Sequence, residues 1–252
     1  MPKQETLAWV FGGHQMVFGP SSEAYIDMTS GTWAPGVSKV LEDYLAPGMV
    51  AVDLGAHIGY FTLQMARAVG PTGTVYSFEP AQENYELLIR NIALNGYQNV
   101  IPVQKAVSDH QGLATFFLNP YSVAHSLRPD TFGKSEATVE VENTSLDNFF
   151  EHQGWPDIHL IKMDIEGIEP VALKGMEEIL TRNKEIRMIS EYVPSILEAG
   201  GEEPHQFLEA LKYFGFNISN ISDKDGLQPF TERMARDPQL RGELFCERSN
   251  LS

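Results

Sequence analysis

The segment Val50–Phe61, VAVDLGAHIGYF, joins an apolar run, a glycine turn and the start of a helical pattern. Such a run bounded by glycine is typical of a buried strand, and in open α/β sheets ligands bind at the N-terminus of the helix that follows. Gly55 and Gly59 let the backbone turn and approach that ligand closely. The segment therefore predicts a cofactor loop in an α/β fold.

The spacing of this loop, Asp-x-Gly-x-x-x-Gly from Asp53, indicates which cofactor it binds. A dinucleotide loop has the spacing Gly-x-Gly-x-x-Gly and receives a pyrophosphate on bare backbone amides. A carboxylate at the start of the loop instead suits a ligand with an ammonium or sulfonium group. The loop favours S-adenosylmethionine (SAM) over a nicotinamide dinucleotide, although a tight turn after a buried strand is the simpler alternative.

A second strand pattern, residues 73–79, ends in Glu79 and Pro80, about twenty residues after Gly59. This is the offset at which an acidic residue binds a ribose in nucleotide-binding βαβ units. We expect Glu79 to bind the ribose, with a solvated glutamate before a helix as the alternative. Tyr60 and Phe78 either line the same pocket or pack in the core.

The chain contains five short motifs in a fixed order: Val52–Thr62, Phe78–Pro80, Asn95–Gly96, Lys105–Asp109 and Ile161–Glu169. Together they resemble the FkbM family of SAM-dependent methyltransferases, and the most specific of them is Lys-x-Asp-x-Glu-Gly-x-Glu at residues 162–169. The resemblance covers roughly residues 47–247. It implies a class I methyltransferase with a doubly wound, mostly parallel seven-stranded sheet whose last strand is antiparallel. It also implies O-methylation of a hydroxyl on a small molecule, such as a sugar or natural product.

The resemblance also implies which residues bind the cofactor. Asp53, Gly55 and Gly59 are assigned to its methionine side, Glu79 to the ribose, and Ser108 with Asp109 to the adenine. The full predicted set is Asp53, Gly55, Ala56, Gly59, Tyr60, Glu79, Ser108, Asp109 and Asp164. The acids Asp53, Glu79, Asp109, Asp164 and Glu191 follow strand patterns, so they converge at the carboxyl edge of the predicted sheet.

Methyl transfer from sulfonium to oxygen needs a nucleophile held near attack and a group that removes or shares its proton. Asp164, at a strand end, is the first candidate for this base, and Glu166 and His125 are further catalytic candidates. Glu169 follows in the same motif. Acids at a helix N-terminus and histidines in loops also occur without any catalytic role. His57 is expected to orient the cofactor loop rather than to act as a base.

Asp164 and Glu191 also form a candidate Mg²⁺ site, because some related O-methyltransferases hold Mg²⁺ with acids at these strand ends. Those enzymes carry a lysine three residues after the aspartate, where this chain has Gly167, so their mechanism does not transfer intact. A metal-dependent catechol-type or N-methyltransferase, a SAM-binding protein without catalysis, and a nicotinamide oxidoreductase remain as alternatives.

Composition is consistent with one sizeable domain, since the chain has 252 residues of which 42% are hydrophobic. Residues 47–252 are expected to form the methyltransferase domain, and residues 1–46 an N-terminal extension that is a possible cover of the acceptor site. Aromatic residues are candidates for the acceptor wall: Tyr25, Trp33 and Tyr192.

The formal net charge of −16 opposes binding to nucleic acid or to an anionic membrane surface. A single cysteine, Cys246, excludes an intramolecular disulfide, and its apolar neighbours predict a buried strand thiol. No signal sequence or membrane helix is expected, and a reducing cytoplasm fits. The expected partner is a small hydroxylated acceptor, and a homo-oligomer is left open.

Hydrophobic periodicity predicts the order of the elements. Strands are expected at 49–54, 73–79, 100–106, 158–163, 186–190, 216–221 and 243–248, and helices at 58–69, 81–95 and 204–214. A hairpin of 113–118 and 138–142 is expected to enclose residues 119–136, a polar stretch that is a candidate substrate loop.

Overall fold

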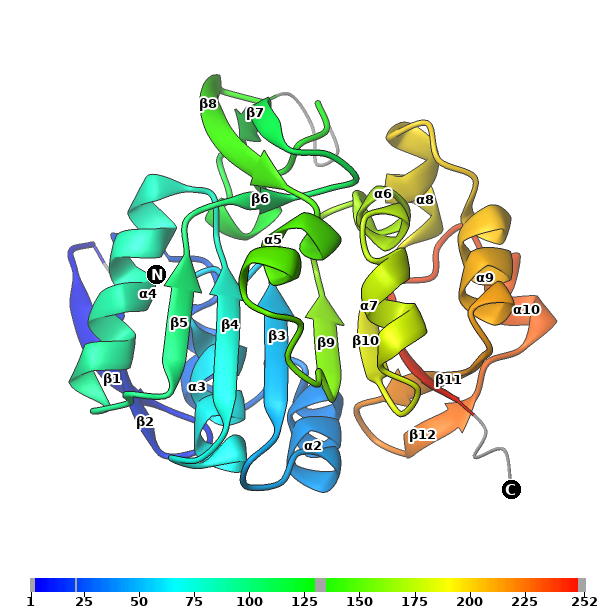
Figure 1. The fold of residues 1–252 in the computed structure, drawn as a ribbon. Coiled ribbons are helices and arrows are strands. Elements are labelled where there is room, and N and C mark those ends of the chain that lie inside the picture. The colour runs from blue at the N-terminus through cyan, green and yellow to red at the C-terminus, as the bar shows by residue number, and fades with distance from the viewer. Residues whose placement is uncertain (1–2, 21, 130–134, 249–252) are drawn as a thin grey trace.

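The computed structural model describes residues 3–20, 22–129 and 135–248. An eight-stranded sheet with the order β12-β11-β13-β10-β9-β3-β4-β5 runs through the molecule (Figure 1). Its strands are β3 (Val50–Leu54), β4 (Thr74–Phe78), β5 (Val100–Val103), β9 (Leu160–Met163), β10 (Arg187–Tyr192), β11 (Phe216–Ser222), β12 (Gly226–Pro229) and β13 (Gly242–Arg248).

The five strands from β5 to β10 are mutually parallel, and β13 runs antiparallel to both β10 and β11. The predicted mostly parallel sheet with an antiparallel last strand is therefore confirmed. Strand β12 adds an eighth strand at the edge, as a hairpin with β11. The sequence did not predict it because Gly226–Pro229 lacks the alternating apolar residues of a strand.

Helices cover both faces of the sheet, and each face has its own hydrophobic core. One face packs against α5 (Leu146–His152), α6 (Glu169–Lys174), α7 (Glu177–Arg182), α8 (Pro194–Ala199) and α9 (Pro204–Tyr213), and the short α10 (Glu232–Ala235) lies at its edge. The other face packs against α2 (Pro35–Tyr44), α3 (Tyr60–Val69) and α4 (Gln82–Leu94). Successive strand residues alternate between the faces, so Val52 and Leu54 join the first core and Ala51 the second.

A three-stranded sheet, β6-β8-β7, stands above the carboxyl ends of β4 and β5 (Figure 1). Its strands are β6 (Ala106–Val107), β7 (Gly112–Leu118) and β8 (Ala137–Thr144), which confirms the predicted hairpin. The predicted strand 100–106 is wrong in one respect, because the chain leaves β5 after Val103 and joins β8 at Ala106. Within the predicted substrate loop, residues 130–134 lie outside the described residues.

The N-terminal segment forms β1 (Thr6–Val10), β2 (His14–Phe18) and α1 (Tyr25–Ser30). Two asparagines bond to the backbone edge of β2: Asn91 of α4 contacts Val17, and Asn95, the C-cap of α4, contacts Gln15. The buried side chains of β2 belong to the same core as α2 and α3. The predicted extension is therefore packed onto the sheet, and its last part is α2.

Two sequence predictions concern features away from the site. Cys246 is buried in β13, and burial raises the pKa of its thiol to about 12, so the predicted buried strand thiol is confirmed. Within the described residues, no helix combines the length and the apolar character that crossing a membrane requires.

Candidate active site

The loop after β3 is held close to the end of β9. The amides of Gly55 and Ala56 both donate to the carbonyl oxygen of Phe78, at 3.1 and 2.9 Å. Gly55 has φ 78°, and a Cβ atom there would lie 1.9 Å from the carbonyl oxygen of Asp164. Gly59, with φ 98°, starts α3, and a Cβ there would lie 2.8 Å from Leu88. The positive φ angles favour glycine at both positions, and at Gly55 the close approach of the Asp164 backbone also requires it.

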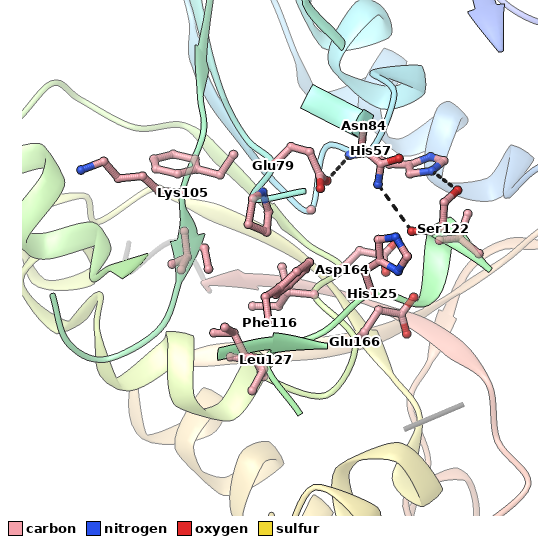
Figure 2. Close-up of a pocket in the computed structure, with 18 residues that line it drawn as sticks. His57, Glu79, Asn84, Lys105, Phe116, Ser122, His125, Leu127, Asp164 and Glu166 are labelled. Carbon is pink, nitrogen blue, oxygen red and sulfur yellow. Dashed lines mark hydrogen bonds between the residues drawn. The ribbon is translucent and has the colours of Figure 1, made fainter. Parts of the chain in front are cut away.

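A cavity opens between this loop, the end of β4 and the small sheet (Figure 2). We call it the Glu79 cavity; it encloses about 530 Å³ of empty space including its mouth. Its walls include apolar side chains from several elements: Phe78, Val107, Phe116, Leu127, Ile165 and Ile168. An apolar slot with a few polar groups is typical of a small-molecule site.

Glu79 lies in this cavity with both carboxylate oxygens anchored. Oε2 accepts from the amide of His57 and Oε1 from the amide of Ala81, each at 2.9 Å. Burial raises the pKa of Glu79 to about 7. Because each carboxylate oxygen has two lone pairs, the fixed group still has acceptor capacity for ligand hydroxyls. Its position fits the predicted ribose role.

The predicted adenine pair does not reach the cavity. The Ser108 hydroxyl accepts from Asn143 Nδ2 at 2.6 Å, and Asp109 is exposed beside His110. Residues 105–107 line the cavity instead, although the Lys105 ammonium points away from it and pairs with Glu142. The departure of the chain from β5 into β6 places the backbone before Ser108 at the cavity wall.

Asp53 is also not among the lining residues. It is fully buried beneath α3, where Oδ2 accepts from Thr62 Oγ1 at 2.6 Å. Its register neighbour on β9 is Lys162. Burial raises the pKa of Asp53, against the opposing effect of the Lys162 ammonium. The Asp53 carboxylate therefore lies outside the lining of the cavity, and its contact with the cofactor's methionine side stays a prediction.

A second cavity, of about 1030 Å³ including its mouth, shares Gly55, His57, Val123, Asp164 and Glu166 with the first. We call it the acidic cavity, because Asp164, Glu166, Glu191 and Glu243 all line it. Its aromatic lining consists of Trp33, Tyr60, Phe61 and Tyr121. The two cavities therefore meet at Asp164.

Strand alternation gathers the charged groups of the acidic cavity. Lys162, Glu191 and Glu243 share the sheet face covered by α2 and α3, because their strand neighbours alternate between the two cores. The Lys162 ammonium donates to Asp164 Oδ2 at 3.1 Å and lies 4.8 Å from the centre of the Phe61 ring. This lysine is 1% exposed, so it is a fixed part of the site.

Three of the acids converge closely. One carboxylate oxygen from each of Asp164, Glu166 and Glu191 lies within 4.8 Å of the others. Burial, and then repulsion by neighbouring carboxylates, raises the pKa of Glu166 and Glu191 well above the usual value. Burial raises the pKa of Glu243 to about 8. The sequence prediction of Asp164 beside Glu191 therefore matches the geometry, with Glu166 as a third member.

Sequence reasoning missed Lys162 and Glu243 as site residues. Lys162 belongs to the family motif but had no assigned role. Glu243 is a charged residue in an apolar strand, two positions before the buried Phe245. Residues two positions apart in a strand point to the same face of the sheet, so the sequence places this charge on the face of a buried residue. That pattern could have identified Glu243 as a site residue.

Glu169 fixes the turn that carries Glu166. Its oxygens accept from the amides of Ile165 and Gly167, at 2.8 and 3.0 Å. Burial raises its pKa to about 7. Glu166 itself has φ 59°, a left-handed conformation, and is buried. Of the acids in this motif, Glu169 thus holds the backbone while Asp164 and Glu166 face the cavities.

His125 lines the Glu79 cavity, but its geometry opposes the predicted role as a base. Its Nδ1 accepts from the amide of Asn119 at 3.0 Å, so the neutral ring carries its proton on Nε2. Burial lowers its pKa. His125 therefore presents a donor. His57 bonds through Nε2 to the Ser122 hydroxyl at 2.9 Å, and burial lowers its pKa to about 4, which fits its expected orienting role.

The three aromatic residues predicted for the acceptor wall have different positions. Trp33 lines the acidic cavity. Tyr25 packs edge-to-face against Phe18, and Tyr192 is fully buried against Phe230. Of the three, only Trp33 lines either cavity.

The ligand-free protein is expected to lose stability as the pH rises from 6.5 to about 8. In the folded protein the pKa is about 7 for Glu79 and Glu169 and about 8 for Glu243, because these carboxyls are buried. In the unfolded chain the same carboxyls release their protons near pH 4.5. The folded state then binds more protons, so its stability falls with rising pH. The neutral buried His57 acts in the opposite sense, but only below 6.5. Melting temperatures across this range test the prediction: Glu243→Gln should reduce the fall, and a rise would contradict it.

Comparison with known proteins gives a consistent result. Residues 53–218 match the Methyltransferase FkbM domain. Methyltransferase sdnD of Sordaria araneosa is 30% identical over 67% of this chain and 73% of its own. The 31-O-demethyl-FK506 methyltransferase FkbM of Streptomyces tacrolimicus is 26% identical over 75% and 79%.

The fold also has solved counterparts. The structure of SMU.1697c from Streptococcus mutans, in complex with S-adenosylhomocysteine, superimposes with a TM-score of 0.50 at 11% identity, over 84% of this chain and 96% of that one. At this identity the likeness concerns the fold alone. The domain match covers well over half of the sequence, and the strand order, the cofactor loop and the carboxylates at the sheet edge agree with it. The chain therefore belongs to the FkbM family of methyltransferases.

Proposed function

We propose that the protein transfers the methyl group of SAM to a hydroxyl of a small molecule. The observation that carries this proposal is the meeting of two cavities at Asp164. One cavity has an anchored carboxylate suited to a ribose, and the other has room for an acceptor. A shared wall between cofactor and acceptor is the arrangement that a direct displacement requires.

The Glu79 cavity is the place for the adenosine half of the cofactor. Glu79 would accept hydrogen bonds from the ribose hydroxyls, and the apolar walls around Phe116 would cover the adenine. The loop of Gly55, Ala56 and His57 extends from there into the acidic cavity and would receive the methionine half.

Asp164 is the proposed general base. It lies at the junction of the cavities, and its ion pair with Lys162 fixes the carboxylate. SAM would supply the methyl group to the acceptor oxygen with loss of its bond to sulfur, and Asp164 would take the hydroxyl proton. Glu166 lies beside it and can share this proton.

The relatives support a small acceptor. The name of the Streptomyces tacrolimicus relative gives 31-O-demethyl-FK506, a small molecule with a free oxygen position, as its substrate. Trp33 with Met28 and Ala34 would form one wall of the acceptor site, as the predicted cover by the N-terminal segment requires. Glu23 ties the N-terminal segment to the cavity wall, because its carboxylate accepts a hydrogen bond from the amide of Val123. A cytoplasmic location and a homo-oligomer stay predictions.

Calorimetry and a labelled methyl group test the proposed function. The protein should bind SAM and S-adenosylhomocysteine but not NAD, and it should transfer label from SAM to oxygen in a library of hydroxylated compounds. Binding of NAD without SAM would contradict the assignment. Binding of SAM with no transfer to any compound would favour a SAM-binding protein without catalysis, and label on nitrogen would favour N-methylation.

Mg²⁺ is the alternative occupant of the acids. Asp164, Glu166 and Glu191 offer the oxygen ligands it prefers, and it would lower the pKa of a bound hydroxyl. However, the Lys162 ammonium is already bonded to Asp164 and would repel an adjacent metal ion. We therefore expect EDTA to leave methyl transfer unchanged. The metal-dependent alternative would be established if EDTA abolished turnover and added Mg²⁺ restored it. In that case Glu191→Gln should raise the Mg²⁺ concentration that turnover requires.

A further inference from the structure

We infer that the acceptor carries a positively charged amino group, which binds among Glu166, Glu191 and Glu243 of the acidic cavity. This inference rests on the proposed function and names the class of its acceptor: an amine-bearing hydroxyl compound. It excludes acceptors whose corresponding group is a carboxylate.

The first observation is that two carboxylate oxygens of residues that line the acidic cavity lack donors. Glu166 Oε2 and Glu243 Oε2 are buried and have no hydrogen-bond partner among the described residues. The Glu166 side chain belongs to a residue only 9% exposed, and it lines the acidic cavity. Buried acceptors without partners are costly, so a ligand that brings N–H donors is expected to satisfy them.

The second observation is an unfavourable pair within the sheet. Glu191 on β10 lies directly opposite Glu243 on β13. Like charges at directly opposed positions of antiparallel strands are destabilising. A cation bound between the two carboxylates would be attracted to both of them and would offset their mutual repulsion. A binding site for a cationic ligand is therefore a physical reason for this pair.

The cofactor alone does not balance the charge. Four carboxylates line the acidic cavity, and the only cationic side chain among its described lining residues is Lys162. SAM has two positive groups and one carboxylate, so it brings one net positive charge. With all four acids ionised, two negative charges therefore remain when the cofactor is bound. The ligand-free protein avoids this charge by retaining protons, because burial and neighbouring carboxylates raise the pKa of Glu166 and Glu191, and burial raises the pKa of Glu243. A cationic acceptor would allow these acids to ionise.

The aromatic walls distinguish an ammonium from a metal ion. Trp33, Tyr60, Phe61 and Tyr121 line the same cavity as the acids. Aromatic faces attract organic cations, whereas Mg²⁺ prefers oxygen ligands and retains water. The Lys162 ammonium, 4.8 Å from the centre of the Phe61 ring, already makes this contact within the cavity.

Three phenols with the same ring test the inference: tyramine, para-ethylphenol and hydroxyphenylpropionate carry a cationic, a neutral and an anionic tail. Their binding to the full chain is measured by calorimetry, with and without S-adenosylhomocysteine, in the presence of EDTA. Tyramine should bind about ten- to a hundredfold more tightly than para-ethylphenol, as expected for a charge-assisted hydrogen bond. Hydroxyphenylpropionate should bind most weakly.

Glu243→Gln and Glu191→Gln should each reduce the preference for tyramine, measured in each variant as the ratio of tyramine affinity to para-ethylphenol affinity. The matched control is Glu140→Gln, which makes the same change at an exposed position of β8 and should leave the preference intact. Equal binding of the three phenols, binding of none, or an unchanged preference in both variants overturns the inference. Failure to bind S-adenosylhomocysteine would instead contradict the proposed function, and the phenol series without cofactor would still decide this point.

Discussion

Asp164→Asn is expected to lower the rate of methyl transfer by about 10²–10⁴, the usual contribution of a positioned general base. The carboxylate lies where the two cavities meet, and asparagine keeps its shape but cannot take the proton. SAM affinity should fall much less than the rate, because the proposed cofactor contacts lie mainly at Glu79 and the loop after β3. Single-turnover rates and calorimetry on the same variant separate the two effects.

Two further variants make this prediction specific. Asp157→Asn makes the same change at an exposed position just before β9 and should retain the wild-type rate. His125→Ala should preserve the acidic limb of the pH profile, because the Nδ1 atom of this histidine is occupied by the Asn119 amide. Wild-type turnover in Asp164→Asn would refute the assignment of the base. Loss of the acidic limb in His125→Ala would assign that role to the histidine.

Glu79→Ala is expected to weaken SAM binding by roughly ten- to a hundredfold, which corresponds to about 1.5–3 kcal/mol for a lost charge-assisted hydrogen-bond partner. The substitution also removes the acceptor that holds the His57 amide. Glu79→Gln keeps one acceptor oxygen and should therefore lose less affinity. Calorimetric titration with SAM measures both variants, and unchanged affinity in Glu79→Ala would remove the ribose assignment.

The variant Asp109→Ala tests a point on which the sequence resemblance and the structure disagree. The sequence resemblance places Asp109 at the adenine, whereas the structure leaves it exposed and outside both cavities. We expect this variant to bind SAM like the wild type. A loss comparable to that of Glu79→Ala would restore the prediction made from the sequence.

Local features of the chain were predictable because their causes are local. The apolar run into Gly55 specifies a strand and a turn, and the spacing of Tyr85, Leu88 and Ile92 specifies the inner face of α4. The observed bounds of this helix, Gln82–Leu94, differ from the expected 81–95 by one residue at each end. Glu79 was found in the same way, from its distance to the glycine loop.

The composition of the site depended on which strands are neighbours, and the sequence alone does not fix this. Glu243 lies opposite Glu191, and both share a sheet face with Lys162, because β9, β10 and β13 are neighbours in the sheet. The exit of the chain from β5 turned Ser108 away from the cavity. The sequence therefore determined the family, the cofactor loop and the strand-end acids through short-range patterns. Tertiary pairing alone decided which charges converge, because it brings residues distant along the chain within hydrogen-bonding and Coulombic range.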